Sequence, residues 1–332
     1  MDLRRLKAFM AIAELGSVSQ ASDRLHIAQT ALSRQIQLLE HEIGAELFAR
    51  HHRGMALTPA GDMLLARIGH LVKQLDEALD DVRNASGSIA GEVALGVTPT
   101  ISAVLAGRLA RRVANDLPDV SFRIVEGYTG HQIDWLQRGQ IDIAVVYGPA
   151  TAYHMQAEEL FYERLVLVGP PGSGLRADRP VDFVEAAAHA LVLPSQPHGL
   201  RNIIEKAAAK AKVALAVRFE ADSFHVLLDL VETELGYTIL PLSSIPRQVK
   251  EGRLRFAPLA NPTVMRQIML GLPSGVMPSP ATQRVVSLLK DEIGSMVRER
   301  LWDAQLMYPA TQSAPRPAET KAAPAGAAAC EH

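Results

Sequence analysis

The chain has 332 residues, which is enough for two or three domains that each bury a hydrophobic core. Hydrophobic residues make up 48%, charged residues 21%, and the formal net charge is −2, as in many soluble globular proteins. No apolar run approaches the roughly 18 residues of a membrane span, so no membrane partner is expected. The single cysteine, Cys330, excludes an intramolecular disulfide. Asp2 and Glu14 flank a short apolar stretch that does not resemble a signal peptide, so a cytoplasmic location is expected.

The first elements predicted along the chain are three helices near the N-terminus. Asp2 is a suitable N-cap for the first, and Gly16 supplies the left-handed residue that ends many helices. Ser19 is the predicted cap of a short second helix, and a tight turn leads to a third that runs from about Gln29 to Gly44. Two short helices joined by so brief a turn predict a helix-turn-helix, whose second helix enters the DNA major groove.

The third predicted helix has one apolar and one polar face. Its apolar positions at helical spacing are Leu32, Ile36, Leu39 and Ile43. Its opposite face carries hydrogen-bond donors and a fixed cation, in Thr30, Ser33, Arg34 and Gln37. Because such side chains can reach base edges and phosphates, this face is the predicted DNA-reading surface.

Two short strands within residues 47–57 are predicted to form a hairpin, or wing, beside that helix. Its tip is basic, and Arg50 and Arg53 could reach backbone phosphate or the minor groove. A solvated tip without DNA contacts is the alternative. Residues 26–38 and 48–56 contain no acidic side chain, so the local charge favours DNA although the whole domain is nearly neutral.

A long helix is predicted from Thr58 and Pro59, an N-cap followed by proline at the first helical position. It should run to about residue 84, before a hinge at 85–88. Apolar residues recur along it at spacings of three and four, namely Leu64, Ile68, Leu71, Leu75, Leu79 and Val82. That repeat predicts a two-helix dimer seam, and an ordinary surface helix packed on its own domain is the alternative.

From Gly91 onwards, strands alternate with helices, which implies α/β architecture with mostly parallel sheets. The predicted strands cover residues 93–97, 120–125, 141–147, 165–168, 190–193, 237–240 and 267–272, and a final helix covers 279–297.

Ligands of open α/β sheets bind beyond the carboxyl ends of strands, where helix N-termini favour anions. Loops of that kind are predicted at residues 98–102, 128–130 and 194–201. Their hydroxyls, the imidazole of His198 and the guanidinium of Arg201 suit a small carboxylate. A weaker signal at 222–225 resembles the start of another helix facing the cleft. Alternatively, the threonines serve only as helix caps and Arg201 pairs with Glu205.

Five motifs follow one another over the first 65 residues. They are Phe-Met-Ala-Ile-Ala-Glu-Leu-Gly-Ser at 9–17, Ala-Gln-Thr-Ala-Leu-Ser-Arg-Gln-Ile at 28–36, Leu-Leu-Glu at 38–40, Gly-Ala-Glu-Leu-Phe-Ala-Arg at 44–50 and Leu-Thr-Pro-Ala-Gly at 57–61. Together they resemble the LysR-type transcriptional regulators. The resemblance implies DNA contacts from the start of the recognition helix and from the wing, here Gln29, Thr30, Ser33, Arg34 and Arg53. Many relatives carry proline where Thr30 stands and serine where Ala28 stands.

The resemblance further implies that the long helix pairs antiparallel with its twin, giving a two-fold dimer that matches inverted-repeat DNA. A tetramer is equally open. The α/β part is expected to form two periplasmic-binding-protein-like lobes, joined by crossovers near 158–162 and 262–266. By motif, effector contacts fall on Thr100, Thr129, Tyr147 and Ser195. Several relatives have a basic residue at the position of Tyr147.

Four segments are therefore predicted. They are a winged helix-turn-helix at 1–58, a linker and dimerisation helix with hinge at 59–88, an effector-binding domain at 89–303 (lobe one 91–160 and 267–300, lobe two 161–266), and a disordered Ala/Pro-rich tail at 304–332.

The sequence predicts a regulator that binds an inverted-repeat promoter site and responds to a small molecule, with RNA polymerase as a further partner. Catalytic signatures are absent, and no cofactor or metal ligand set is predicted. Two alternatives remain open. One is a metabolic enzyme or solute-binding protein with a vestigial DNA-binding module, because fold does not fix function. The other is a regulator without an effector, controlled by its abundance.

Overall fold

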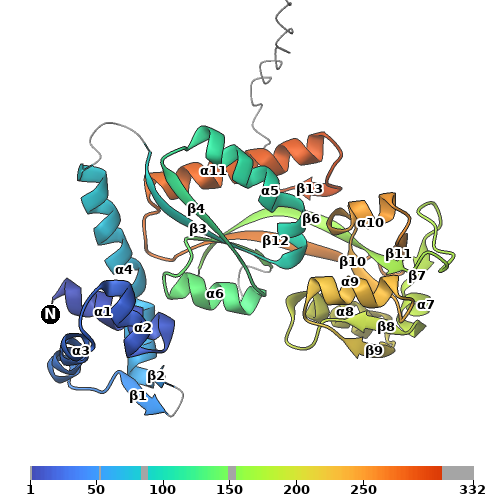
Figure 1. Cartoon of the computed structure of the whole chain (residues 1–332). Coiled ribbons are helices and arrows are strands. Elements are labelled where there is room, and N and C mark those ends of the chain that lie inside the picture. Colours follow the sequence, from blue (N-terminus) through green and yellow to red (C-terminus); the bar gives the residue numbers. More distant parts are fainter. Residues whose placement is uncertain (1, 52–53, 84–88, 149–154, 309–332) are drawn as a thin grey trace, which may run out of the picture.

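The computed structural model describes residues 2–51, 54–83, 89–148 and 155–308. Its N-terminal module contains three helices and a two-stranded hairpin (Figure 1), namely α1 (Leu3–Leu15), α2 (Val18–Leu25), α3 (Gln29–Ile43), β1 (Phe48–His51) and β2 (Gly54–Leu57). Phe9, Ile12 and Leu32 are fully buried at its centre. The ring of Phe9 packs on that of Phe48, with centroids 5.3 Å apart. The predicted winged helix-turn-helix is confirmed.

The helix caps predicted for this module are observed at all but one position. The Asp2 carboxylate accepts from the Arg4 N–H, and Gly16 ends α1 with φ +61°. The predicted cap at Ser19 is wrong, because Ser17 is the extended residue whose hydroxyl accepts from the Gln20 N–H. Ser19 lies inside α2, where its hydroxyl instead accepts from the Gln29 side chain at 3.0 Å.

The long helix α4 (Pro59–Arg83) begins as predicted. The Thr58 hydroxyl accepts from the Gly61 N–H at 3.1 Å and donates to the Glu46 carbonyl at 2.6 Å, which ties the start of α4 to the wing. The predicted hinge at 85–88 lies outside the described residues.

Lobe one contains a sheet in the order β4-β3-β5-β12-β6, with α5 and α11 over one face and α6 over the other (Figure 1). Its elements are β3 (Gly91–Val97), α5 (Pro99–Asp116), β4 (Val120–Glu126), α6 (Thr129–Gln137), β5 (Ile143–Tyr147), the first part of β6 (Gln156–Gly169), β12 (Met265–Leu272) and α11 (Pro280–Arg298). Strands β3, β4 and β5 are parallel, which directs the starts of α5 and α6 to one edge of the sheet.

Lobe two is built around the second part of β6, which pairs antiparallel with β10 and β11. Its other elements are β7 (Val181–Asp182), α7 (Phe183–Ala188), β8 (Leu191–Leu193), α8 (Gly199–Ala211), β9 (Val217–Glu220), α9 (Phe224–Glu232), β10 (Thr238–Pro241), the 3-10 helix η2 (Leu242–Ser244), α10 (Pro246–Lys250) and β11 (Arg255–Ala260). The expectation of mostly parallel sheets is wrong, because the two strands that cross between the lobes pair antiparallel with their neighbours.

The crossovers are β6 and β12, which lie side by side. Strand β6 pairs with β12 as far as Arg164 and with strands of lobe two from Leu165 onwards. Strand β12 begins at Met265, inside the second predicted crossover. Two adjacent strands therefore form the covalent connection between the lobes.

The predicted tail begins too early. Ala304–Leu306 form β13, which pairs antiparallel with β6, and the nearby Trp302 is buried against Phe161. The pairing of β13 with β6 and the burial of the Trp302 ring hold residues 302–306 in place, although the sequence after them is rich in alanine and proline. Residues 309–332 lie outside the described part, so the tail prediction applies to them alone.

Candidate nucleic-acid interface and ligand cleft

Helix α3 buries one face and exposes the other. Leu32, Ile36 and Leu39 are buried in the module, whereas Ile43, the last residue of the predicted stripe, is 39% exposed. On the opposite face Gln29, Thr30, Arg34 and Gln37 are exposed and Ser33 is half-buried. Arg34 has no hydrogen bond or ion pair among the described residues, so its guanidinium is available to a partner.

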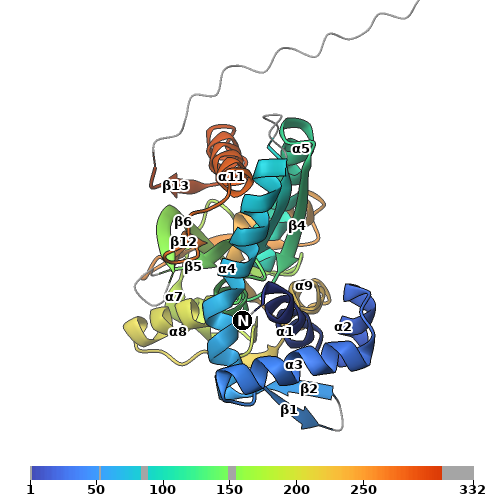
Figure 2. The ribbon, with the colours of Figure 1, turned by 90° about the vertical axis from the view of Figure 1, so that its left-hand side faces the viewer.

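The hairpin lies at the same end of the module as α3 (Figure 2). Its register is fixed by pairing of Arg50 with Met55, and the Met55 N–H donates to the carbonyl of Gly16 at 2.8 Å. A side chain at Gly54 would strike that same carbonyl, so glycine lets the hairpin lie against the end of α1. Arg53 and the side chain of Arg50 lie outside the described residues.

The predicted dimer seam on α4 has two parts. Ile68 and Leu64 pack on the core of the N-terminal module. Farther along, Leu71, Leu75 and Leu79 are 59%, 47% and 45% exposed. The side chain of Val82 lies outside the described residues. An apolar strip of this kind on a long helix is what a second helix could cover.

A different face of α4 contacts the α/β domain. Lys73 donates to the Asp142 carboxylate at 2.5 Å, and Asp142 also accepts from the Ala94 N–H at 2.8 Å. His70 is bonded to the Leu136 carbonyl at the end of α6, and burial lowers the pKa of its imidazole. Gly69 lies against Arg138 so closely that a Cβ would collide with its carbonyl. These contacts connect the linker helix to the effector-binding domain.

Three predicted effector residues, Thr100, Thr129 and Tyr147, come together in lobe one and are buried. The Tyr147 hydroxyl lies 2.9 Å from that of Thr100, and both accept from the guanidinium of Arg266, at 2.8 and 2.7 Å. Arg266 is fully buried and also donates through Nε to Glu163 at 2.7 Å. Arg266 was not predicted, because it lies on β12, far along the chain from Thr100 and Tyr147.

His198 and Gly199 of lobe two meet this group. A Cβ on Gly199 would lie 2.6 Å from the Tyr147 ring, and the His198 ring packs edge-on against Tyr128, with centroids 4.3 Å apart. Burial lowers the pKa of His198 to about 4, and its Nδ1 accepts from the Leu200 N–H. A neutral imidazole thus caps α8 and closes the contact between the lobes.

Arg201 and Ser195 are engaged elsewhere. The Arg201 guanidinium donates to Glu205 at 2.7 Å, to Glu220 at 3.0 Å and to the carbonyl of Pro194. Ser195 donates from its N–H and its hydroxyl to Asp222, which lowers the pKa of that carboxyl. The alternative reading of Arg201 as a partner of Glu205 is thus confirmed, with Glu220 as a second partner.

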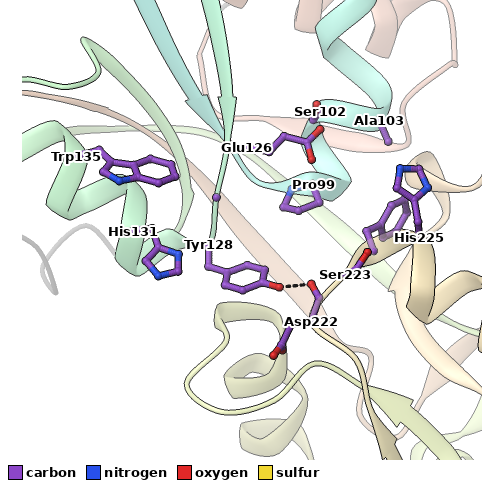
Figure 3. A pocket seen from close by; sticks show the side chains of 12 residues that line it. Pro99, Ser102, Ala103, Glu126, Tyr128, His131, Trp135, Asp222, Ser223 and His225 are labelled. Carbon is purple, nitrogen blue, oxygen red and sulfur yellow. Dashed lines mark hydrogen bonds between the residues drawn. The ribbon is translucent and has the colours of Figure 1, made fainter. Parts of the chain in front are cut away.

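A cavity of about 400 Å³ opens between the lobes next to this closed contact. It is bounded by the starts of α5 and α9 and by the β4–α6 connection (Figure 3), with a lining of Pro99, Ser102, Ala103, Glu126, Gly127, Tyr128, His131, Trp135, Asp222, Ser223, Phe224 and His225. The predicted loops at 98–102 and 128–130 and the weak signal at 222–225 all reach it. Glu126, His131 and Trp135 were missed, because their side chains look like ordinary surface positions in sequence.

Neither a metal centre nor a membrane span is found in the described part of the chain. There, no three or more His, Cys, Asp or Glu side chains gather as a metal would require. No described helix is both long and apolar enough to cross a bilayer.

A winged helix-turn-helix joined by a long helix to a two-lobed α/β domain with a cleft defines a class of ligand-responsive DNA-binding regulators. Comparison with known families agrees. Residues 3–62 match the bacterial regulatory helix-turn-helix protein, lysR family, and residues 86–294 match the LysR substrate binding domain. The chain belongs to the LysR family of DNA-binding transcriptional regulators.

Individual relatives support the same assignment. The chain is 29% identical to the regulator BbuR of Bordetella bronchiseptica, covering 90% of each chain. It is 30% identical to the nitrogen assimilation regulatory protein nac of Klebsiella aerogenes, covering 87% of this chain and 94% of that one. Among solved structures, a full-length OxyR variant from Pseudomonas aeruginosa has the same fold, with a TM-score of 0.72, 22% identity and coverage of 95% and 99%. Full-length CbnR complexed with its target DNA gives a TM-score of 0.61 at 20% identity, covering 88% and 100%.

Proposed function

We propose that this regulator binds an inverted-repeat promoter site as a two-fold assembly and that a small molecule in the inter-lobe cleft modulates its activity. RNA polymerase is the proposed downstream partner and the cytoplasm the proposed compartment. The protein is proposed to act by binding and not by catalysis.

The observation that carries this proposal is the exposed polar face of α3 beside the wing. Phosphate contacts position such a helix, and base contacts supply specificity. We assign base or phosphate contacts to Gln29, Thr30, Ser33, Arg34 and Gln37, and backbone or minor-groove contacts to Arg50 and Arg53. The similar fold of CbnR, which was solved with its target DNA, supports the same use of this module.

The two-fold assembly is proposed to form along α4. Leu71, Leu75 and Leu79 form an exposed apolar strip, and Val82 extends the same repeat. Pairing two such helices antiparallel would present two recognition helices with two-fold symmetry. Dimers and tetramers built on this contact both satisfy the proposal.

We propose that the effect of ligand binding in the cleft is transmitted to α4 through α6. Helix α6 carries His131 and Trp135 of the cleft. At its other end, the Leu136 carbonyl is bonded to His70 of α4, and Arg138, which follows α6, pairs with Asp62 of α4. A ligand that favours one arrangement of the lobes would therefore bias the position of α4 by its differential affinity. The expected carboxylate class rested on hydroxyls, the imidazole of His198 and the guanidinium of Arg201, but that guanidinium is held by Glu205 and Glu220.

Selection of bound fragments from random and genomic DNA, with the full chain at roughly physiological salt, tests the proposal. A two-fold enriched motif is expected, and loss of that motif on Arg34→Ala would tie it to α3. Binding that shows no enrichment and collapses as salt rises would reject promoter recognition. Turnover of a metabolite by the α/β domain would instead favour the enzyme alternative.

A further inference from the structure

The cleft between the lobes is acidic. Glu126 and Asp222 are the charged residues of its lining, and no lysine or arginine is among the described residues that form it. The Glu126 carboxylate has no hydrogen bond or ion pair within the described part of the chain. The hydrogen bonds from Ser195 lower the pKa of Asp222, which keeps its carboxylate ionised near neutral pH. The fully buried guanidinium of Arg266 is held by Glu163, Thr100 and Tyr147.

Helix starts also border the cleft, and their dipoles would favour an anion. Each N-terminus is equivalent to about half a positive charge. Three helices, α5, α6 and α9, begin in the lining, so together they oppose about one and a half of the two carboxylate charges. Pro99 at the first position of α5 has no N–H, and the Ser223 hydroxyl accepts from the Val226 N–H in α9. Both features reduce the N–H donors that α5 and α9 offer to an anionic ligand, and the two carboxylate charges still exceed the opposing charge of the three helix starts.

Aromatic rings form the remaining walls. Trp135 stacks on His131 with centroids 5.9 Å apart, and His131 stacks on Tyr128 at 5.8 Å. In Figure 3 these rings lie on one side of the view and His225 on the other, with the Glu126 carboxylate between them. Phe224 also lines the cavity. Faces of Trp, Tyr and Phe attract cations within about 6 Å.

The charge, the aromatic walls and the volume of the cavity all fit the same class of ligand. Carboxylates without a fixed counter-charge attract a cation, aromatic walls accept an organic ammonium group and its apolar body, and about 400 Å³ is in the usual range for a small organic ligand. We propose that the effector of this regulator is an organic cation with an apolar or aromatic body, bound between Glu126, Asp222 and the Trp135–Tyr128 wall. This inference rests on the proposed function, because it names the ligand of the same cleft.

Matched probes of opposite charge test it directly. We would titrate the full chain with 2-phenylethylammonium, 3-phenylpropanoate and 3-phenylpropan-1-ol by calorimetry at about pH 8, where free imidazoles are neutral. The ammonium probe is expected to bind most tightly. Glu126→Gln should weaken it about tenfold, since one charge is lost from the cleft. Trp135→Leu should weaken it by about three- to tenfold, through loss of the cation–π contact.

Glu159→Gln is the matched control, because Glu159 is an exposed acid on β6 outside the cleft, and it should leave affinity unchanged. Tighter binding of 3-phenylpropanoate, equal binding of all three probes, no binding of the ammonium probe, or indifference to Glu126→Gln would each overturn the inference. DNA selection on the same preparation separates the two proposals. A selected two-fold site with carboxylate preference would reject only the ligand class, whereas absence of a selected site would reject the proposed function.

Discussion

The predicted DNA- and dimer-contact residues differ from the predicted effector-contact residues in their exposure and in the bonds that they already make. On α3 and α4, Arg34, Leu71 and Leu75 are exposed, and the Arg34 guanidinium has no partner among the described residues. Between the lobes, Tyr147 and His198 are buried and already bonded within the chain. Substitutions in the first group should therefore change binding at nearly constant stability. Substitutions in the second group should change stability first.

The largest effect is expected at the seam. Leu71→Asp or Leu75→Asp places a charge in the proposed helix pair and should separate the dimer. Loss of the second recognition head removes bivalent binding, which is worth about 100-fold or more in affinity for a two-fold site. Sedimentation and footprinting on a selected site would measure both losses. The free energy of unfolding of the separate chain should stay within about 0.5 kcal/mol of the parent, as for other surface changes.

Val184→Asp is the control for this pair, because it charges an exposed apolar residue on α7, away from α4. It should leave assembly and footprint intact. A Leu71→Asp protein that still protected a two-fold site like the parent would show that α4 does not form the assembly.

The next effect concerns the buried imidazole of His198, whose pKa is lowered to about 4 by burial. The folded protein keeps it neutral, whereas the unfolded chain binds a proton below about pH 6.5. The free energy of unfolding should therefore be at its full value above about pH 6.5 and fall by up to about 3 kcal/mol towards pH 4. Urea unfolding followed by tryptophan fluorescence measures this, since Trp135 and Trp302 both lie in the α/β domain.

His198→Asn isolates that contribution, because asparagine can still cap α8 and does not titrate. His70 also has a lowered pKa and acts in the same direction, so the difference between parent and variant is the quantity to compare. Parallel pH curves for the two proteins would mean that His198 is not held neutral by the closed lobes.

A smaller effect is expected for Arg34, on the exposed face of α3. Arg34→Ala should reduce specific DNA binding by about 1–3 kcal/mol if the guanidinium makes a bidentate base contact. Its unfolding midpoint should not change, since no intramolecular partner within the described residues is lost. A uniform loss on all DNA sequences, with a reduced salt dependence, would assign Arg34 to phosphate instead.

The sequence predicted features that depend on local signals and missed features that depend on distant residues. The periodic apolar stripes, Gly16 and the Thr58-Pro59 start are local signals, and each predicted element formed. Residue types also pointed to two loops that line the cavity, 98–102 and 128–130, because polar side chains after parallel strands gather at one edge, whereas the loop at 194–201 does not line it. The sequence could not tell which of those side chains would be bonded to each other.

Long-range partners account for what was missed. Arg266 reaches Thr100 from 166 positions away, and Glu220 reaches Arg201 from a separate strand, so no spacing rule reveals either contact. The face of α4 that meets α6 was missed for a related reason. His70 and Lys73 are polar, and polar residues on a helix are expected to face solvent.

The smallest effect tests the junction between α4 and the α/β domain, with Gly69 at that junction and Gly107 of α5 as its matched helical control. Alanine at Gly107 of α5 meets open space, so helix propensity should raise the free energy of unfolding by about 0.5–1 kcal/mol. Alanine at Gly69 of α4 would gain the same propensity but collide with the Arg138 carbonyl, which is backbone and cannot rotate away. Overpacking costs about 1–3 kcal/mol, so Gly69→Ala should be neutral or destabilising. Hydrogen exchange at the end of α6 should increase in that variant alone. Equal stabilisation by both changes would mean that α4 does not rest on the effector-binding domain, and the proposed coupling from cleft to DNA would then need another route.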